Sequence, residues 1–300
     1  MKSKLLLATA LTFIAATAMG QGTELQYKKT PALNEDWQKP FPGFKIVGNF
    51  YYVGTYDLGC YLIDTGQGLI LINTGIEGSY PLIKDNIEKL GFKVSDIKII
   101  TSTHGHRDHV GDIAAFQKAS GAKVYMEERD VKTLESGGNI DYRQPKGRGF
   151  YVYPPIKVDV STKPGDHIKL GNTDLTLRQA FGHTPGATSF TFPVQDGGKT
   201  YNVLIYNSDG INQGVKLLGS PGYPTIVEDF ASTLKEQATY KPDIWVSSHA
   251  GQFNLHQVYK PGDPYNPARF GDLTAYQQKI ATAQKNYEKQ LAEERAAAGK

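Results

Sequence analysis

The chain has 300 residues, of which 39% are hydrophobic and 21% are charged, a composition typical of a globular protein with a large buried core. Its formal net charge is only +3, so the chain is neither strongly basic nor strongly acidic as a whole, and the charge balance indicates neither nucleic acid nor a membrane surface as a partner. A small-molecule substrate is therefore expected.

The first 20 residues have the pattern of a secretory signal peptide. Two lysines, Lys2 and Lys4, precede an apolar run from Leu5 to Ala16, and small residues follow as far as Gly20. A transmembrane anchor is the alternative, but it needs about 20 continuous apolar residues and this run is shorter. Loss of the two lysines with the signal peptide would lower the formal charge from +3 to +1.

The only cysteine is Cys60, so no lipid-attachment cysteine follows the signal and no intrachain disulfide can form. An exported protein without disulfides suits a bacterial periplasm. We therefore expect residues 1–20 to be a signal peptide and residues 21–300 to fold as a single periplasmic domain without a membrane anchor, and we expect a monomer. Cys60 itself is interpreted as a small buried residue.

The first half of the chain alternates strands and helices. Residues 44–75 contain short β-rich runs separated by glycine turns, which predicts a strand meander. A helix is expected from Ser79, with Pro81 in its first turn and Gly91 at its end. The apolar run 97–102 follows as a buried strand.

A helix beginning near His109 and a strand at Ala122–Met126 are expected next. The second half repeats this style and ends with a helix from Thr274, whose last residues, from Glu293, are expected to fray. Together these elements predict an α/β fold in which two β-sheets pack against each other with helices outside. The predicted strands of the second half are 174–181, 187–194, 200–208 and 243–248, with a helix around Phe230.

The segment "THGHRDH", residues 103–109, carries three of the chain's seven histidines. It lies where a strand ends and a helix begins, and imidazole with carboxylate is a ligand set that suits Zn²⁺. Gly105 allows the backbone to bend between His104 and His106. A polar loop with Asp108 as the helix N-cap is the alternative, but it explains one aspartate and none of the histidines.

Two distant histidines also follow predicted strands. His183 lies in "GHTPGATSF" and His249 in "WVSSHAGQF", so both are expected at the edge that carries the first cluster. Five histidines and one aspartate exceed what one tetrahedral zinc ion needs. Two zinc ions, each with three protein ligands, fit this set better.

These motifs identify the chain as similar to the metallo-β-lactamase fold, whose mark is HxHxDH followed by two later histidines. The chain resembles in particular subclass B3, through "THGHRDHVGD", "GHTPGATSF" and "SSHAGQFNLH", and its GOB-type branch through "GNFYYVGTYDLGCYLI" and "GDPYNPARF". The resemblance covers almost all of the chain after the signal peptide. It implies an αββα sandwich.

The resemblance also implies a ligand set and a reaction. The first zinc ion would be held by His104, His106 and His183, and the second by Asp108, His109 and His249. The implied reaction is hydrolysis of the β-lactam amide of penicillins, cephalosporins and carbapenems by a metal-activated hydroxide. Asp108 would in addition act catalytically, by orienting the nucleophile or relaying a proton.

The sequence departs from its relatives at three positions. The GOB-type branch often has Gln at the first motif position, where this chain has His104. The other lactamase subclasses use a cysteine ligand after the strand that ends near residue 208, and this chain has none there. Many members of the wider superfamily carry Asp in place of Asn73.

Asp209 keeps a second function open. In glyoxalases, lactonases and other relatives, an aspartate near this position bridges both metals, which would favour a di-zinc hydrolase acting on a lactone or thioester. An Asp-Gly turn is the simpler interpretation of Asp209-Gly210. Ala187 replaces a histidine typical of glyoxalases. A zinc-binding or sensory protein without enzyme activity is a third possibility, but a complete set of six ligands argues against it.

The remaining motif residues are given structural roles. His167 is expected at the surface, His256 in the packing near the C-terminal region, and Arg107 in a surface or supporting ion pair. Tyr56 and Tyr223 are candidates for the rim of the pocket. Residues 137–155, rich in Gly, Pro and Tyr, are a candidate rim loop.

Overall fold

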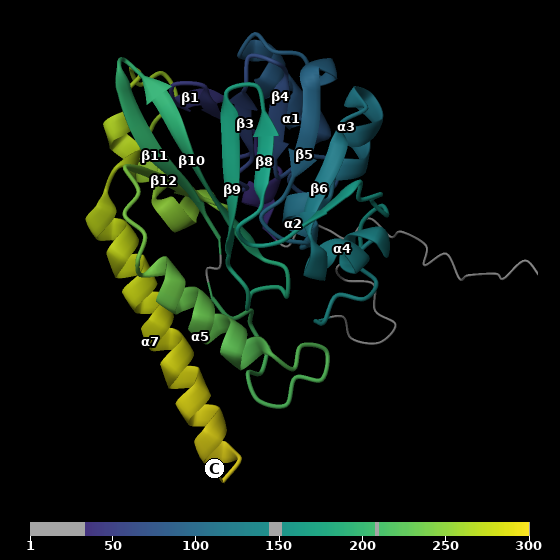
Figure 1. Ribbon diagram of the computed structural model, residues 1–300, viewed down its shortest axis with the longest axis vertical. Helices are drawn as coiled ribbons and strands as arrows, with labels where there is room; N and C mark the ends of the chain where they lie inside the picture. Colours follow the sequence, from purple (N-terminus) through teal and green to yellow (C-terminus); the bar gives the residue numbers. More distant parts are fainter. Residues whose placement is uncertain (1–33, 144–151, 208–209, 300) are drawn as a thin grey trace, which may run out of the picture.

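The computed structural model describes residues 34–143, 152–207 and 210–299. Within these ranges, two β-sheets pack against each other and the helices lie outside them (Figure 1). The α/β architecture predicted from the sequence is confirmed. The predicted signal peptide, residues 1–20, lies outside the described residues. No helix in the described ranges is long and apolar enough to cross a membrane.

The first sheet contains the predicted meander. Strands β1 to β4 pair antiparallel with one another, and the pairs from β4–β5 to β6–β7 are parallel. The seven strands lie side by side in chain order: β1 (Phe44–Val47), β2 (Phe50–Tyr52), β3 (Tyr61–Asp64), β4 (Leu69–Ile72), β5 (Ile97–Thr101), β6 (Lys123–Glu127) and β7 (Val160–Thr162).

The second sheet has five strands: β8 (His167–Leu170), β9 (Thr173–Gln179), β10 (Thr188–Asp196), β11 (Lys199–Tyr206) and β12 (Ile244–Ser247). They too lie in chain order across the sheet. All neighbours are antiparallel except β11 and β12, which are parallel. A parallel pair needs a long crossover, and the helix between these two strands provides it.

The helices are α1 (Tyr80–Lys89), α2 (Arg107–Val110), α3 (Ile113–Ser120), α4 (Glu128–Glu135), α5 (Ile226–Gln237), α6 (Leu255–Val258) and α7 (Leu273–Ala297). Short 3-10 helices cover Glu35–Trp37, Val94–Asp96, Ala250–Phe253 and Pro267–Phe270. In Figure 1, α5 and α7 run side by side on the outside of the second sheet.

Two expectations about helix ends need correction. The helix expected near His109 begins at Arg107, so Asp108 and His109 both lie in the single turn of α2. The expected end of α7 near Glu293 is instead helical as far as Ala297, where Leu291 is buried and Glu294 accepts hydrogen bonds from the backbone of Leu217 and Leu218.

Strand alternation divides the core into two layers. In β3 and β4, Tyr61, Ile63, Ile70 and Ile72 join the cluster formed with inward residues of the second sheet, whereas Leu62 and its neighbours face α1 and α3. Successive strand side chains point to opposite faces, so a strand buried on both faces reads as continuous apolar sequence. Full burial of each such side chain contributes about 1.5–3 kcal/mol.

The ends of β5, β9 and β12 meet at one edge of the sandwich. Thr188 N donates to Thr103 O at 2.7 Å, which ties the start of β10 to the residues after β5. Ser248 Oγ, just after β12, donates to Thr103 Oγ1 at 3.0 Å. The loops that follow these strands therefore converge on one place.

Candidate metal centre

The loop after β5 presents its histidines because a glycine lets it approach α4 closely. Gly105 N donates to Asp130 Oδ2 at 2.8 Å, and a Cβ atom at Gly105 would come within 3.0 Å of Leu134 Cδ1. His104 and His106 flank this glycine. Asp108 and His109 follow in α2, so four predicted ligands come from one tight turn.

Asp130 also fixes the loop that carries His183. Its carboxylate accepts hydrogen bonds from Thr184 Oγ1 at 2.7 Å and from Gly186 N at 2.8 Å. Asp130 is buried, and its hydrogen bonds to both loops compensate for that burial. One side chain of α4 therefore fixes the His104–His106 turn and the His183 turn relative to each other.

The structure brings His104, His106 and His183 together. One ring nitrogen from each lies within 4.8 Å of the others. The ring centroids are 4.6–4.8 Å apart, and His183 Nδ1 contacts Gly210 O at 3.0 Å. This group is the one predicted for the first zinc ion.

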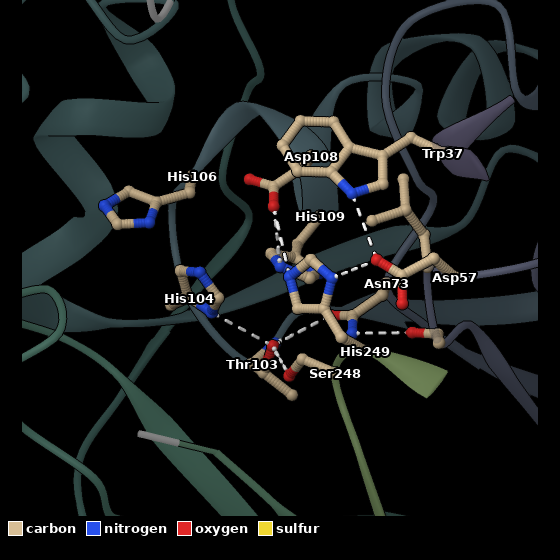
Figure 2. Close-up of polar contacts among 12 residues, drawn as sticks. Trp37, Asp57, Asn73, Thr103, His104, His106, Asp108, His109, Ser248 and His249 are labelled. Carbon is tan, nitrogen blue, oxygen red and sulfur yellow. Dashed lines mark hydrogen bonds and ion pairs between the residues drawn. The ribbon is translucent and has the colours of Figure 1, made fainter. Parts of the chain in front are cut away.

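The second predicted group surrounds Asp108. Its Oδ2 atom lies 3.2 Å from His109 Nε2 and 3.3 Å from His249 Nε2, as Figure 2 shows. His104 also lies within 4.8 Å of the ligand atoms of Asp108 and His109. His104 therefore stands at the boundary between the two groups, and His249 joins the second from the opposite side.

A carboxylate outside the cluster orients His249. Asp57 Oδ2 contacts His249 Nδ1 at 2.9 Å and accepts a hydrogen bond from Trp37 Nε1 at 3.1 Å (Figure 2). With Nδ1 held by Asp57, Nε2 of the imidazole faces Asp108. This is the arrangement by which carboxylates fix the ring orientation of metal-ligating histidines.

An observation that does not depend on the sequence motif also indicates that these side chains bind a metal. His104 Nε2, His106 Nε2 and both ring nitrogens of His109 are buried and have no hydrogen-bond partner among the described residues. Buried polar atoms are nearly always satisfied, so a cluster of exceptions needs an explanation. A bound cation would satisfy an unpaired ring nitrogen of each of these histidines, which belong to the two groups described above.

Burial keeps three of the predicted ligands, His104, His106 and His183, in the neutral form that metal binding requires. It lowers the pKa of His104 and His106 well below the usual range, and it lowers the pKa of His183 to about 4. Burial opposes the charge of Asp108, but His109 and His249 outweigh it and hold the pKa of that carboxyl well below normal. Neutral imidazole and ionised carboxylate are the ligating forms.

A cavity of about 650 Å³ opens over the cluster. Its wall includes His106, Asp108, His183 and His249, so members of both groups face it. The volume is typical of a site for a small organic molecule. The rest of the wall consists of Trp37, Arg107, Tyr142, Arg143, Asn212, Gln213, Gly214, Val215, Lys216, Gly219, Ser220 and Pro221.

Comparison with known proteins identifies the family. The model of the metallo-beta-lactamase superfamily matches residues 60–198. The metallo-beta-lactamase GOB-18 from Elizabethkingia meningoseptica is 42% identical, with a TM-score of 0.85 over 89% of this chain and 98% of that one. The chain belongs to the metallo-β-lactamase superfamily. It is therefore an enzyme of that family, and the fold predicted from the resemblance is confirmed.

Two further solved structures place the chain within the family. A beta-lactamase from Chitinophaga pinensis is 44% identical, with a TM-score of 0.85 over 88% of this chain and 99% of that one. The class B3 di-zinc metallo-beta-lactamase LRA-12 from an Alaskan soil metagenome is 42% identical, with a TM-score of 0.84 over 87% and 98%. The resemblance to subclass B3 and its GOB-type branch is confirmed.

Several side chains in this metallo-β-lactamase site were not anticipated. Asp57, Trp37 and Asp130 carry no motif signal, because their importance comes from contacts with residues far along the chain. Arg143 was missed as an individual residue, although residues 137–155 were expected at the rim. That expectation is confirmed for Tyr142 and Arg143, which line the cavity; residues 144–151 lie outside the described ranges.

The other sequence interpretations have mixed outcomes. Cys60 is buried, as expected, and His167 is exposed beside Asp174. His256 packs on Tyr56 with ring centroids 3.8 Å apart, so its role is structural. Arg107 does form an ion pair, but the pair is buried.

The two tyrosine candidates for the pocket rim do not line the cavity. Tyr56 is held against His256, and Tyr223 is buried with its hydroxyl on Thr184 O. Asp209 lies outside the described residues, so its proposed contact with metal remains a prediction.

Proposed function

We propose that this enzyme is a di-zinc β-lactamase that hydrolyses the amide of penicillins, cephalosporins and carbapenems. One zinc ion is assigned to His104, His106 and His183, and the other to Asp108, His109 and His249. The observation that carries the proposal is the set of unpaired buried imidazole nitrogens beneath a cavity large enough for a bicyclic lactam. Solved lactamases that are 42–44% identical over most of the chain support it.

Zinc bound in these groups would polarise the lactam carbonyl and lower the pKa of water to about 7. The chain's own contribution is to hold the imidazoles of His104, His106 and His183 neutral and in fixed positions and to present Asp108 to the cavity. At this position the Asp108 carboxylate can orient the attacking water and accept its proton. Asp57 and Asp130 keep the ligand loops in place.

Export and quaternary state complete the proposal. Residues 1–20 are assigned as the signal peptide, which directs residues 21–300 to the periplasm, where a β-lactam would meet the enzyme. The protein is expected to act as a monomer.

A substrate panel tests the assignment. Purified protein with zinc should hydrolyse a penicillin, a cephalosporin and a carbapenem, which is followed by loss of the lactam chromophore. An aryl lactone and a thioester, measured in parallel, should react far more slowly. Turnover of the lactone or thioester without turnover of any lactam would refute the proposal and make Asp209 the first residue to substitute.

A further inference from the structure

The hydroxyl group of Thr103 lies next to the first predicted zinc ligand. Thr103 is buried, and its Oγ1 atom lies 3.2 Å from His104 Nδ1 (Figure 2). The same oxygen lies 3.2 Å from Asn73 Oδ1 and 3.0 Å from Ser248 Oγ. Among the described residues, Thr103 Oγ1 is the one hydrogen-bond partner of His104 Nδ1, and His104 Nε2 has none. The imidazole ring thus has one nitrogen held by the protein and one left for a metal.

The orientation of Asn73 decides where the hydroxyl hydrogen of Thr103 points. The Nδ2 atom of Asn73 donates to Gly59 O at 2.9 Å, and its Oδ1 atom accepts from Thr103 N at 2.9 Å. The amide therefore turns its oxygen, which has no hydrogen to donate, toward Thr103. Ser102 Oγ lies 2.9 Å from the same oxygen but has a second acceptor, His104 O, at 3.0 Å. Asn73 Oδ1 is then available to the hydroxyl of Thr103.

The hydrogen-bonding capacity of a hydroxyl group fixes the remaining contact. A threonine hydroxyl has one hydrogen to donate and two lone pairs that accept. Its hydrogen goes to Asn73 Oδ1, and Ser248 Oγ donates to one of its lone pairs. The lone pair that remains faces His104 Nδ1, so this nitrogen carries the hydrogen of the neutral imidazole. The lone pair of His104 Nε2 is then free to bind a cation.

We propose that Thr103 is a positioning residue that selects the metal-binding tautomer of His104, with the hydrogen on Nδ1 and the lone pair on Nε2. The inference rests on the zinc assignment of the proposed function and adds the group that prepares His104 before a metal binds. Without the hydroxyl group, no described side chain holds the hydrogen on Nδ1. The tautomer with its hydrogen on Nε2 then competes with metal binding.

The tautomer is measured first, by nuclear magnetic resonance of chelator-stripped full-length protein whose histidines carry nitrogen-15. The chemical shift of an imidazole nitrogen distinguishes its protonated from its unprotonated form, and His104→Gln identifies the signals of His104 by their loss. Wild-type protein should carry the hydrogen of His104 on Nδ1. Thr103→Val replaces the hydroxyl group with a methyl group of similar size, so it should shift His104 toward the tautomer with the hydrogen on Nε2.

Zinc affinity, measured by competition against a chromophoric chelator, is the second readout. The binding step that His106→Ala removes identifies the first zinc site. Thr103→Val should weaken this step by about 10- to 100-fold, the range seen for groups that support metal-bound histidines. Thr103→Ser keeps the hydroxyl group and should retain an affinity near the wild-type value.

Thr233 provides a matched control. It is buried in α5, and its hydroxyl group has no hydrogen-bond partner among the described residues. Thr233→Val makes the same exchange of hydroxyl for methyl and should change neither the tautomer of His104 nor the zinc affinity. Circular dichroism of every variant separates loss of fold from loss of the contact.

Three outcomes would overturn the proposal while leaving the zinc assignment intact. Metal-free wild-type protein could carry the hydrogen of His104 on Nε2, Thr103→Val could keep the wild-type tautomer and zinc affinity, or Thr103→Ser could weaken zinc binding as much as Thr103→Val. The first outcome needs no variant, so it decides the matter even if Thr103→Val does not fold. If wild-type protein binds no zinc, the metal assignment itself fails, and the role of Thr103 fails with it.

Discussion

At the scale of single residues, the contacts of Asn73 give a physical reason for an asparagine at a position where many relatives carry Asp. Asn73 has a φ of 62°, a conformation that asparagine tolerates better than most residues. Its Nδ2 atom donates to Gly59 O at 2.9 Å, and its Oδ1 atom accepts from Thr103 N at 2.9 Å. An ionised aspartate could make the second contact but could not donate in the first. The amide thus joins the segment before β3 to the residue preceding His104.

Asp57 gives the residue-scale prediction. Asp57→Ala removes the acceptor that orients His249, so the affinity for the zinc ion assigned to Asp108, His109 and His249 should fall by about 10- to 100-fold, as for other carboxylates behind metal-bound histidines. The measurement is zinc competition against a chromophoric chelator.

Asp174→Ala is the matched control, because it removes an exposed carboxylate that contacts His167 at 2.5 Å. Zinc binding should be unaffected in that variant. Equal zinc affinities in Asp57→Ala and wild-type protein would show that Asp57 does not position a metal ligand.

At the scale of elements, the end of α7 supports the cavity loop. Glu294 accepts hydrogen bonds from Leu217 N at 3.0 Å and Leu218 N at 2.7 Å, and Gln290 Nε2 donates to Val215 O at 2.9 Å. Residues 212–216 on that loop line the cavity. The helix therefore does more than cover the sheet, since its last turns hold one wall of the site.

Glu294→Ala should loosen that wall. Loss of two hydrogen bonds of about 1 kcal/mol each predicts a KM increase of roughly 5- to 30-fold with a smaller change in kcat, measured on a penicillin. Glu293→Ala, at the exposed neighbour that contacts Lys289, should leave KM near the wild-type value. A KM that moves equally in both variants would mean that the loop does not depend on Glu294.

At the scale of the whole molecule, local signals predicted most of the architecture. The β-rich runs between glycine turns in residues 44–75 and the apolar run before the cluster located the first sheet, and the HxHxDH spacing located the centre. The contacts of Asp57 and Asp130 could not be predicted, because they join segments 25 to 192 residues apart and leave no periodic pattern. The exact start of α2 was also missed, because a single helical turn has no hydrophobic period to read.

The most direct test of the whole account is a zinc titration of chelator-stripped protein, with bound zinc and carbapenem hydrolysis measured on the same samples. The account predicts no turnover without metal, saturation at two zinc ions per chain, and recovery of hydrolysis as the sites fill. Two bound zinc ions without hydrolysis, or hydrolysis that persists after the metal is removed, would contradict it.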